Sequence, residues 1–223
     1  TQGPACAIAA GAATIYRNYC VPVGDARGQT EHLQLDCLAD IGCALGNTSS
    51  RLWRMRNGYA LFTENGLHAI DEYLAALDEP GIDALRARLR IGLHWQVDVT
   101  DVSNPGLRVS QAFCSALPIV YQSLPSHLWH RFAILVLEAA YEATLLAAVL
   151  NRAAHGSPLV FLTSVGGGAF GNSSAWIHAA MRRGLDKVRD AGLQVHLVSR
   201  SEVPEAFRSL CETYSDPPDR GVR

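Results

Sequence analysis

The chain has 223 residues and a mass of 24.1 kDa, which suits one large α/β domain or two small ones. Apolar residues make up 48% and charged residues 18%, which excludes a disordered, coiled-coil or collagen-like chain. The net charge is −2 and the pI about 6.4, so no diffuse positive field attracts nucleic acid or an anionic membrane. We therefore expect neither as a partner.

The cysteines are scattered, and no two of them form a C-x-x-C pair. They are Cys6, Cys20, Cys37, Cys43, Cys114 and Cys211. Structural zinc sites usually contain such pairs, and small secreted scaffolds carry a denser set of cysteines. We interpret these residues as free thiols of a protein in a reducing compartment, with no bound metal. The chain starts at Thr1 without a signal-like segment, so we expect a trimmed chain or a domain cut from a longer protein, and this start does not reveal its destination in the cell. The reducing compartment that free thiols indicate is expected to be the cytoplasm, or a host cytosol into which the protein is delivered.

Both helices and strands are predicted along the first hundred residues. The small apolar run at 6–16 suits a buried strand, and turn-forming residues at 17–28 indicate a loop. Apolar residues at near-helical spacing predict a helix at 29–45 that stops at Gly46-Asn47. A turn at Asn57-Gly58 follows, then a helix at 64–77, a helical turn at 83–90 and a strand at 91–102 that Asn104-Pro105-Gly106 closes.

The second half contains the clearest helix, residues 128–154, which is apolar on most faces. Its polar and charged residues argue against a membrane span, since the apolar run is interrupted by His130, Arg131, Glu138 and Glu142. Strands at 158–165 and 193–198 alternate with helices at 174–191 and 202–214. Such alternation predicts a mostly parallel sheet with helices on both faces, in one domain over residues 1–214, followed by a flexible tail at 215–223.

The most specific local pattern is a strand, then GGGAFGN at 166–172, then a helix. Consecutive glycines expose backbone N–H groups, which together with a helix N-terminus form a cradle for an anion. No lysine follows, so the loop is not that of a nucleoside triphosphatase. A plain tight turn without ligand is the alternative. Gly166, Gly168 and Gly171 also fit G-x-G-x-x-G, but a dinucleotide site lacks support because the next strand ends in Ser199-Arg200.

A second polar cluster follows the first predicted strand. It comprises Arg17, Asn18, Tyr19, Gly24, Asp25, Gly28, Gln29, Glu31 and Asp36. This density is typical of a site at the carboxyl end of a strand, and a solvated loop is the alternative. Glu31 and Asp36 are five residues apart, so spacing alone does not pair them as acid and base. Neither the histidines nor Ser164 and Ser115 have the sequence context of a metal site or a nucleophile.

Several segments in order resemble a known family. VFLTSVGGGAFGN resembles the second phosphate loop of macrodomains, and AIAAGAATIYRNY, NGYAL, QAFCSALPIVY and LEAAYEAT extend the likeness over most of the chain. The chain is similar to the MavL-like ADP-ribosyl hydrolases, a macrodomain group related to microbial poly(ADP-ribose) glycohydrolases. The resemblance implies a three-layer α/β/α fold with a mixed, mostly parallel sheet.

The resemblance also implies a site for ADP-ribose. The residues assigned to the ligand are Asn18, Tyr19, Gln29, Ser164, Gly166, Gly167, Gly168, Ala169, Phe170, Gly171 and Asn172. Gln29-Thr30-Glu31 keeps only part of the Gln-Glu-Glu motif of the glycohydrolases, which argues against polymer hydrolysis. The aspartates of the MavL-like group match Asp36 and, before it, Asp25, whereas Glu31 matches the second acid of the glycohydrolase motif.

The function implied is removal of single ADP-ribosyl groups from protein side chains, with arginine favoured and ubiquitin as one candidate substrate. A carboxylate can stabilise the oxocarbenium-like state and deprotonate water, so no cofactor is expected. The chain is also expected to be a monomer. Two alternatives stay open. One is an ADP-ribose reader without turnover, and the other is an oxidoreductase that uses a nicotinamide dinucleotide.

Overall fold

The computed structural model describes residues 11–100, 103, 106–199 and 202–215. In the first half the elements are α2 (Gly11–Ile15), the π-helical turn η1 (Tyr16–Cys20), β1 (Pro22–Val23), β2 (Ala26–Arg27), α3 (Ala39–Ala44), η2 (Thr48–Ser50), β3 (Trp53–Arg56), β4 (Tyr59–Phe62), α4 (Glu64–Ala75), α5 (Glu79–Arg86) and β5 (Gly92–Asp98). In the second half they are β6 (Arg108–Phe113), η3 (Ile119–Tyr121), α6 (Ser126–His155), β7 (Leu159–Thr163), η4 (Gly168–Phe170), α7 (Ser174–Lys187), η5 (Arg189–Ala191), β8 (Gln194–Val198) and α8 (Glu205–Tyr214).

The strands are joined in pairs. Three pairs are antiparallel, β1–β2, β3–β4 and β5–β6, and one is parallel, β7–β8. Asn57 and Gly58 both have positive φ in the turn between β3 and β4, as a two-residue hairpin turn requires. The mixture of helices and strands agrees with the predicted α/β class, but these pairs do not show one mostly parallel sheet.

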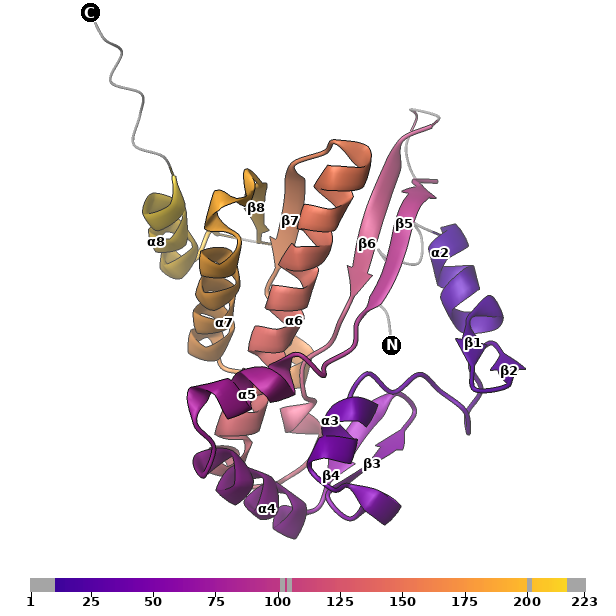
Figure 1. Ribbon diagram of the computed structural model, residues 1–223, viewed down its shortest axis with the longest axis vertical. Coiled ribbons are helices and arrows are strands. Elements are labelled where there is room, and N and C mark those ends of the chain that lie inside the picture. The colour runs from indigo at the N-terminus through magenta and orange to yellow at the C-terminus, as the bar shows by residue number, and fades with distance from the viewer. Residues whose placement is uncertain (1–10, 101–102, 104–105, 200–201, 216–223) are drawn as a thin grey trace, which may run out of the picture.

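Helix α6 forms the centre of the molecule (Figure 1). It runs past both β5–β6 and β7–β8, and it contacts α4, α5 and α7. Elements α3, α4, α5, β3 and β4 gather around its first half, whereas α7 lies along α6 and α8 lies on the outer side of α7. Gly156, in the left-handed conformation, ends the helix, and its backbone amide donates a hydrogen bond to the carbonyl of Arg152. The helix predicted at 128–154 is therefore confirmed with small shifts at both ends.

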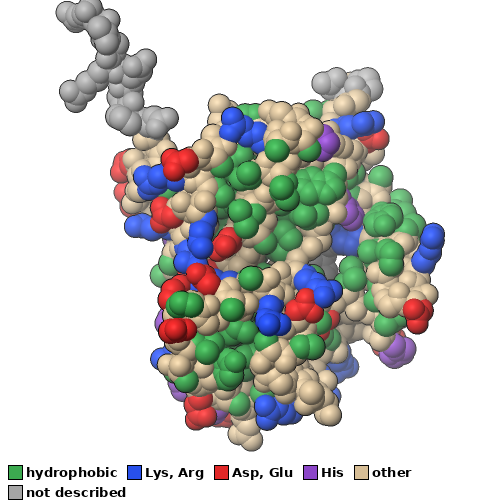
Figure 2. Space-filling view, viewed as in Figure 1, with side chains coloured by type: hydrophobic (Ala, Val, Ile, Leu, Met, Phe, Trp, Pro, Cys, Tyr) green, Lys and Arg blue, Asp and Glu red, His purple; other side chains and the backbone are tan. Residues whose placement is uncertain are grey.

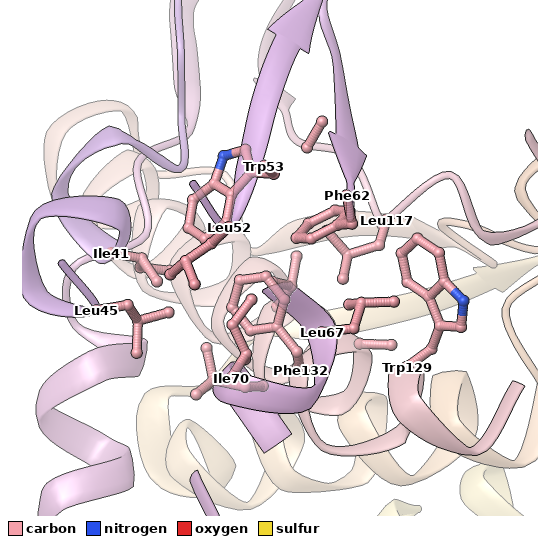
Figure 3. Close-up of a cluster of buried hydrophobic side chains, with 14 of the residues drawn as sticks. Ile41, Leu45, Leu52, Trp53, Phe62, Leu67, Ile70, Leu117, Trp129 and Phe132 are labelled. Carbon is pink, nitrogen blue, oxygen red and sulfur yellow. The ribbon is translucent and has the colours of Figure 1, made fainter. Parts of the chain in front are cut away.

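Two hydrophobic clusters are packed on α6. The first, which joins α6 to α3, α4 and the β3–β4 hairpin, includes Trp53, Phe62, Trp129 and Phe132 (Figure 3). The Phe62 ring lies 5.2 Å from the Trp129 ring and 5.8 Å from the Phe132 ring. The second cluster packs the buried faces of β7, α7 and α8 against the second half of α6. Because α6 contributes to both clusters, it fixes the two halves of the chain to one another.

Two expectations for the N-terminal region are wrong. The part of the predicted strand at 6–16 that the structure describes is helical, since Gly11–Ile15 is an α-helix; residues 6–10 lie outside the described part. Periodicity does not separate a short buried strand from a buried helix, and the alanines favour the helix. Of the helix predicted at 29–45, only Ala39–Ala44 forms, because the Thr30 hydroxyl accepts the amides of His32 and Leu33 and holds a turn there.

Helix α6 is long and apolar enough to cross a membrane, judged by length and composition alone. In the structure, half of its most apolar window is buried against other elements. The rest of that helix includes the exposed Leu146 and Leu150, and Figure 2 shows hydrophobic side chains gathered over its upper part. Core helices of water-soluble proteins have the same features, so the helix by itself is weak support for a membrane span.

Candidate functional site

A cavity of about 690 Å³ lies where the N-terminal segment meets the body of the protein. Its walls come from η1, the loop before α3, the β3–β4 turn, the start of β5, and the residues after β6. Figure 2 shows the surface hollowed between the part that contains α2, β1 and β2 and the rest. The volume is within the range of small-molecule sites, which is about 300–1,000 Å³. Four predicted site residues line it: Asn18, Gln29, Glu31 and Asp36.

Gln29 fixes one wall of this cavity. Its side-chain nitrogen donates to the carbonyl of Arg17 over 2.9 Å, and its side-chain oxygen accepts the amide of Leu35 over 3.1 Å. Its backbone amide donates to the carbonyl of Asn18 over 2.7 Å. Gly28 makes this approach possible, because a Cβ there would lie 2.8 Å from the carbonyl oxygen of Tyr19. Gln29 thus holds η1 against the segment at 30–36. Its side-chain polar atoms are occupied by the backbone groups of Arg17 and Leu35.

Asp36 is half-buried at the edge of the cavity. Burial raises the pKa of its carboxyl group, and the bond that its Oδ1 accepts from the Leu38 amide over 2.8 Å acts in the opposite direction. A carboxylate with a raised pKa is a stronger base, which suits abstraction of a proton from water. Asp36 is therefore a half-buried carboxylate on the cavity whose raised pKa suits the role of a base.

The other predicted site residues of the N-terminal region differ in whether they line the cavity. Glu31 is exposed and lines the cavity, so it stays a candidate. Asp25 lies in the exposed turn between β1 and β2 and is not among the residues lining the cavity. Tyr19 is 75% exposed and also lies outside the lining. The structure brings Asn18, Glu31 and Asp36 together but not Asp25 or Tyr19.

The glycine-rich loop lies behind another wall of the same cavity. The side-chain amide of Asn172 donates to the carbonyls of Leu117 and Gly166 over 2.9 Å and 3.1 Å. Leu117 and its neighbour Ala116 line the cavity, although the loop itself and Ser164 do not. Helix α7 begins at Ser174, directly after the loop, as the sequence predicts. The loop is thus attached to the cavity wall.

The four glycines of the loop are glycine for different reasons. Gly166 and Gly171 have positive φ, and neither position has room for a side chain. An added Cβ would lie 2.3 Å from Ala116 at position 166 and 2.2 Å from Val120 at position 171. Gly168 also has positive φ but faces open space. Gly167 has φ −69°, and a Cβ there would meet its nearest atom at an ordinary 3.5 Å. Packing accounts for two glycines, whereas nothing in the packing requires glycine at 167.

Three aromatic rings connect the loop to the cavity. Phe170 of the loop packs edge-on against Tyr59 at 5.9 Å and against Tyr121 at 5.5 Å between ring centroids. Tyr59 lines the cavity. Gln122 holds this wall in place, because its side chain bonds both the amide and the carbonyl of Phe62 over 2.7 Å. Phe170, predicted to touch the ligand, therefore lies beside the cavity against a residue of its lining.

Two cationic residues of the lining, Arg17 and Arg90, are not among the residues that the resemblance assigns to the ligand. Arg17 is buried, with its guanidinium 3.8 Å from the centre of the Phe113 ring. Arg90 forms a bidentate pair with Asp40, over 2.5 Å and 2.8 Å. Arg17 belongs to the polar cluster and to the RNY segment of the resemblance, whereas no pattern in the sequence singled out Arg90. The lining thus contains both acidic and basic groups, which suits a ligand with anionic and polar parts.

Among the described residues, no group of three or more His, Cys, Asp or Glu side chains is arranged to hold a metal ion. Comparison of the chain with protein-family models, with curated proteins and with solved structures gives no match.

Proposed function

We propose that this protein is an ADP-ribosyl hydrolase that removes single ADP-ribose groups from modified protein side chains, with arginine as the preferred linkage. The observation that carries the proposal is that one cavity collects Asn18, Glu31 and Asp36 and shares a wall with the glycine-rich loop. The resemblance assigns the ribose to the first group and the diphosphate to the second. Glycine at 167, which packing does not require, supports close approach of a ligand to the backbone.

In the proposed reaction, Asp36 accepts a proton from water while the water oxygen bonds to the anomeric carbon of the ribose. The bond from that carbon to the guanidinium nitrogen breaks, and the nitrogen keeps the electron pair. The departing guanidine takes up a proton from solvent, and Asp36 returns its own proton to solvent. The transition state carries positive charge on the ribose ring, which nearby carboxylates stabilise. Glu31, exposed on the same cavity, is the competing base.

The three-layer macrodomain fold belongs to this proposal, and the surroundings of β6 support it. Ser110 bonds Asn151 of α6 over 2.6 Å, and Cys114 contacts Thr144 of α6 at 3.8 Å. Phe113, which points to the other face, is covered by Arg17 of η1. This strand therefore has helical segments on both sides. We also propose a cytoplasmic or host-cytosolic location and an ADP-ribosylated protein, with ubiquitin as one candidate, as the substrate.

The test is release of ADP-ribose from arginine-, serine- and glutamate-modified proteins, together with calorimetry of ADP-ribose binding. Asp36→Asn should lower turnover by about a hundredfold or more, since a general base contributes ~10²–10⁴-fold, and should keep ADP-ribose affinity. Asp25→Asn makes the same change outside the cavity and should keep wild-type turnover.

Three other outcomes would overturn parts of the proposal. Loss of turnover in Glu31→Gln with a normal Asp36→Asn would make Glu31 the base. Tight binding without release from any modified protein would indicate a reader. Absence of ADP-ribose binding would refute the proposed function.

A further inference from the structure

Tyr141, in the middle of α6, holds the entrance to the glycine-rich loop. Its hydroxyl donates to the carbonyl of Thr163 over 2.7 Å and accepts the amide of Val165 over 2.9 Å. Thr163 is the last residue of β7, so both bonds fall where the strand ends. The side chain is 2% exposed, which excludes direct contact with a ligand.

These two bonds determine how the chain leaves the strand. The Val165 amide also bonds the Thr163 carbonyl over 2.9 Å, so the chain makes a tight turn at Ser164. The next residue, Gly166, has φ +83° and lies against Ala116 of the cavity wall. A single buried hydroxyl on α6 therefore fixes the residues directly before the loop, while Asn172, the last residue of the loop, is bonded to Leu117 of the cavity wall.

We infer that Tyr141 is a positioning residue for the ligand, because its hydroxyl sets the conformation in which the loop presents its amides to the diphosphate. The inference rests on the proposed function and assigns a role to a segment, LEAAYEAT, to which the resemblance gave none. Oriented amides bind an anion more tightly when their geometry is fixed beforehand, because no ordering cost is then incurred on binding. Loss of the hydroxyl should therefore weaken binding while the chemical step at Asp36 proceeds at its normal rate.

The experiment compares Tyr141→Phe with Tyr214→Phe. Tyr214→Phe is the control, because it also removes one hydroxyl oxygen and two hydrogen bonds. The Tyr214 hydroxyl of α8 bonds the backbone carbonyl of Arg182 and the carboxylate of Asp186, both in α7. For Tyr141→Phe we expect faster hydrogen exchange of the amides of Val165 and Gly166–Gly168 in the free protein. We also expect about tenfold weaker ADP-ribose binding and a similarly higher KM, the loss that one or two hydrogen bonds produce, with kcat within about twofold of wild type. Tyr214→Phe should leave all of these unchanged.

Exchange in the loop at the wild-type rate in Tyr141→Phe would overturn the inference. So would unchanged ADP-ribose affinity in that variant, or an equal loss in the Tyr214→Phe control. Failure of the wild-type protein to bind ADP-ribose would instead refute the proposed function and the role in binding. In that case the exchange measurement still decides by itself whether Tyr141 holds the loop.

Discussion

The side-chain amide of Asn172 donates to the carbonyl of Leu117 across 55 residues of chain, over 2.9 Å. Asn172 ends the glycine-rich loop, and Leu117 belongs both to the cavity wall and to the hydrophobic core around Phe62 and Trp129. Both residues are buried. The loop is therefore attached to a rigid part of the protein, and any ligand that bridges loop and cavity meets two surfaces of fixed separation.

The first prediction concerns this attachment. Asn172→Ala removes the side-chain hydrogen bonds to the carbonyls of Leu117 and Gly166, which each keep one backbone amide partner. Two lost hydrogen bonds should lower the free energy of unfolding by about 2 kcal/mol. Urea denaturation measures it. The neighbouring Ser173→Ala changes an exposed side chain without a capping bond and should stay within about 0.5 kcal/mol of wild type. Equal stability of the two variants would contradict the attachment.

The second prediction separates the glycines of the loop. Gly167→Ala should fold with near wild-type stability, since the added Cβ makes only ordinary contacts, yet it should weaken ADP-ribose binding because the methyl group covers the backbone. Gly166→Ala should destabilise the protein, because its Cβ would overlap Ala116 and φ is positive there. Melting temperatures and calorimetry distinguish the two effects. Unchanged affinity in a folded Gly167→Val variant would refute the phosphate assignment.

The third prediction uses the raised pKa of Asp36. The pKa is raised because the folded state desolvates the carboxylate, so ionised Asp36 costs stability at neutral pH and the cost disappears when it is protonated. Asp36→Asn should therefore melt above wild type at pH 7. The difference should shrink as the pH falls through the raised pKa toward the ordinary value of about 3.9. A difference that grows on acidification would contradict the burial of the charge. Asp25→Asn, in an exposed turn, is the control.

The fourth prediction concerns the thiols. Cys20, Cys37, Cys43, Cys114 and Cys211 are free, and Cys6 lies outside the described residues. Burial raises the pKa of the Cys114 thiol, and burial followed by the charge of Asp36 raises that of Cys37. Because the thiolate is the reactive form, iodoacetamide should modify these two slowly and the exposed Cys20, Cys43 and Cys211 rapidly, as peptide mass spectrometry can follow. Added reductant should leave the melting temperature unchanged, and a large fall would contradict free thiols.

The sequence by itself determined the elements whose signals are local. The long apolar run of α6, the turn at Asn57-Gly58 and the strand–glycines–helix order at 158–191 were all predicted and all occur, because periodicity and backbone sterics act over a few residues. The polar residues of the candidate cavity were also recognisable, since Asn18, Gln29, Glu31 and Asp36 form a dense cluster in the chain.

Only the tertiary structure decided what local signals leave open. The side chains of Thr30 and Gln29 bond the backbone and stop a helix that apolar spacing predicts there. The structure places Asp36 and Glu31 on the cavity but Asp25 outside it, although all three share one segment. The hydrogen bonds from the Val165 amide to the Tyr141 hydroxyl and from Asn172 to Leu117 join residues 24 and 55 positions apart. Such contacts depend on how α6 and the strands pack together, and no pattern within a single element encodes that packing.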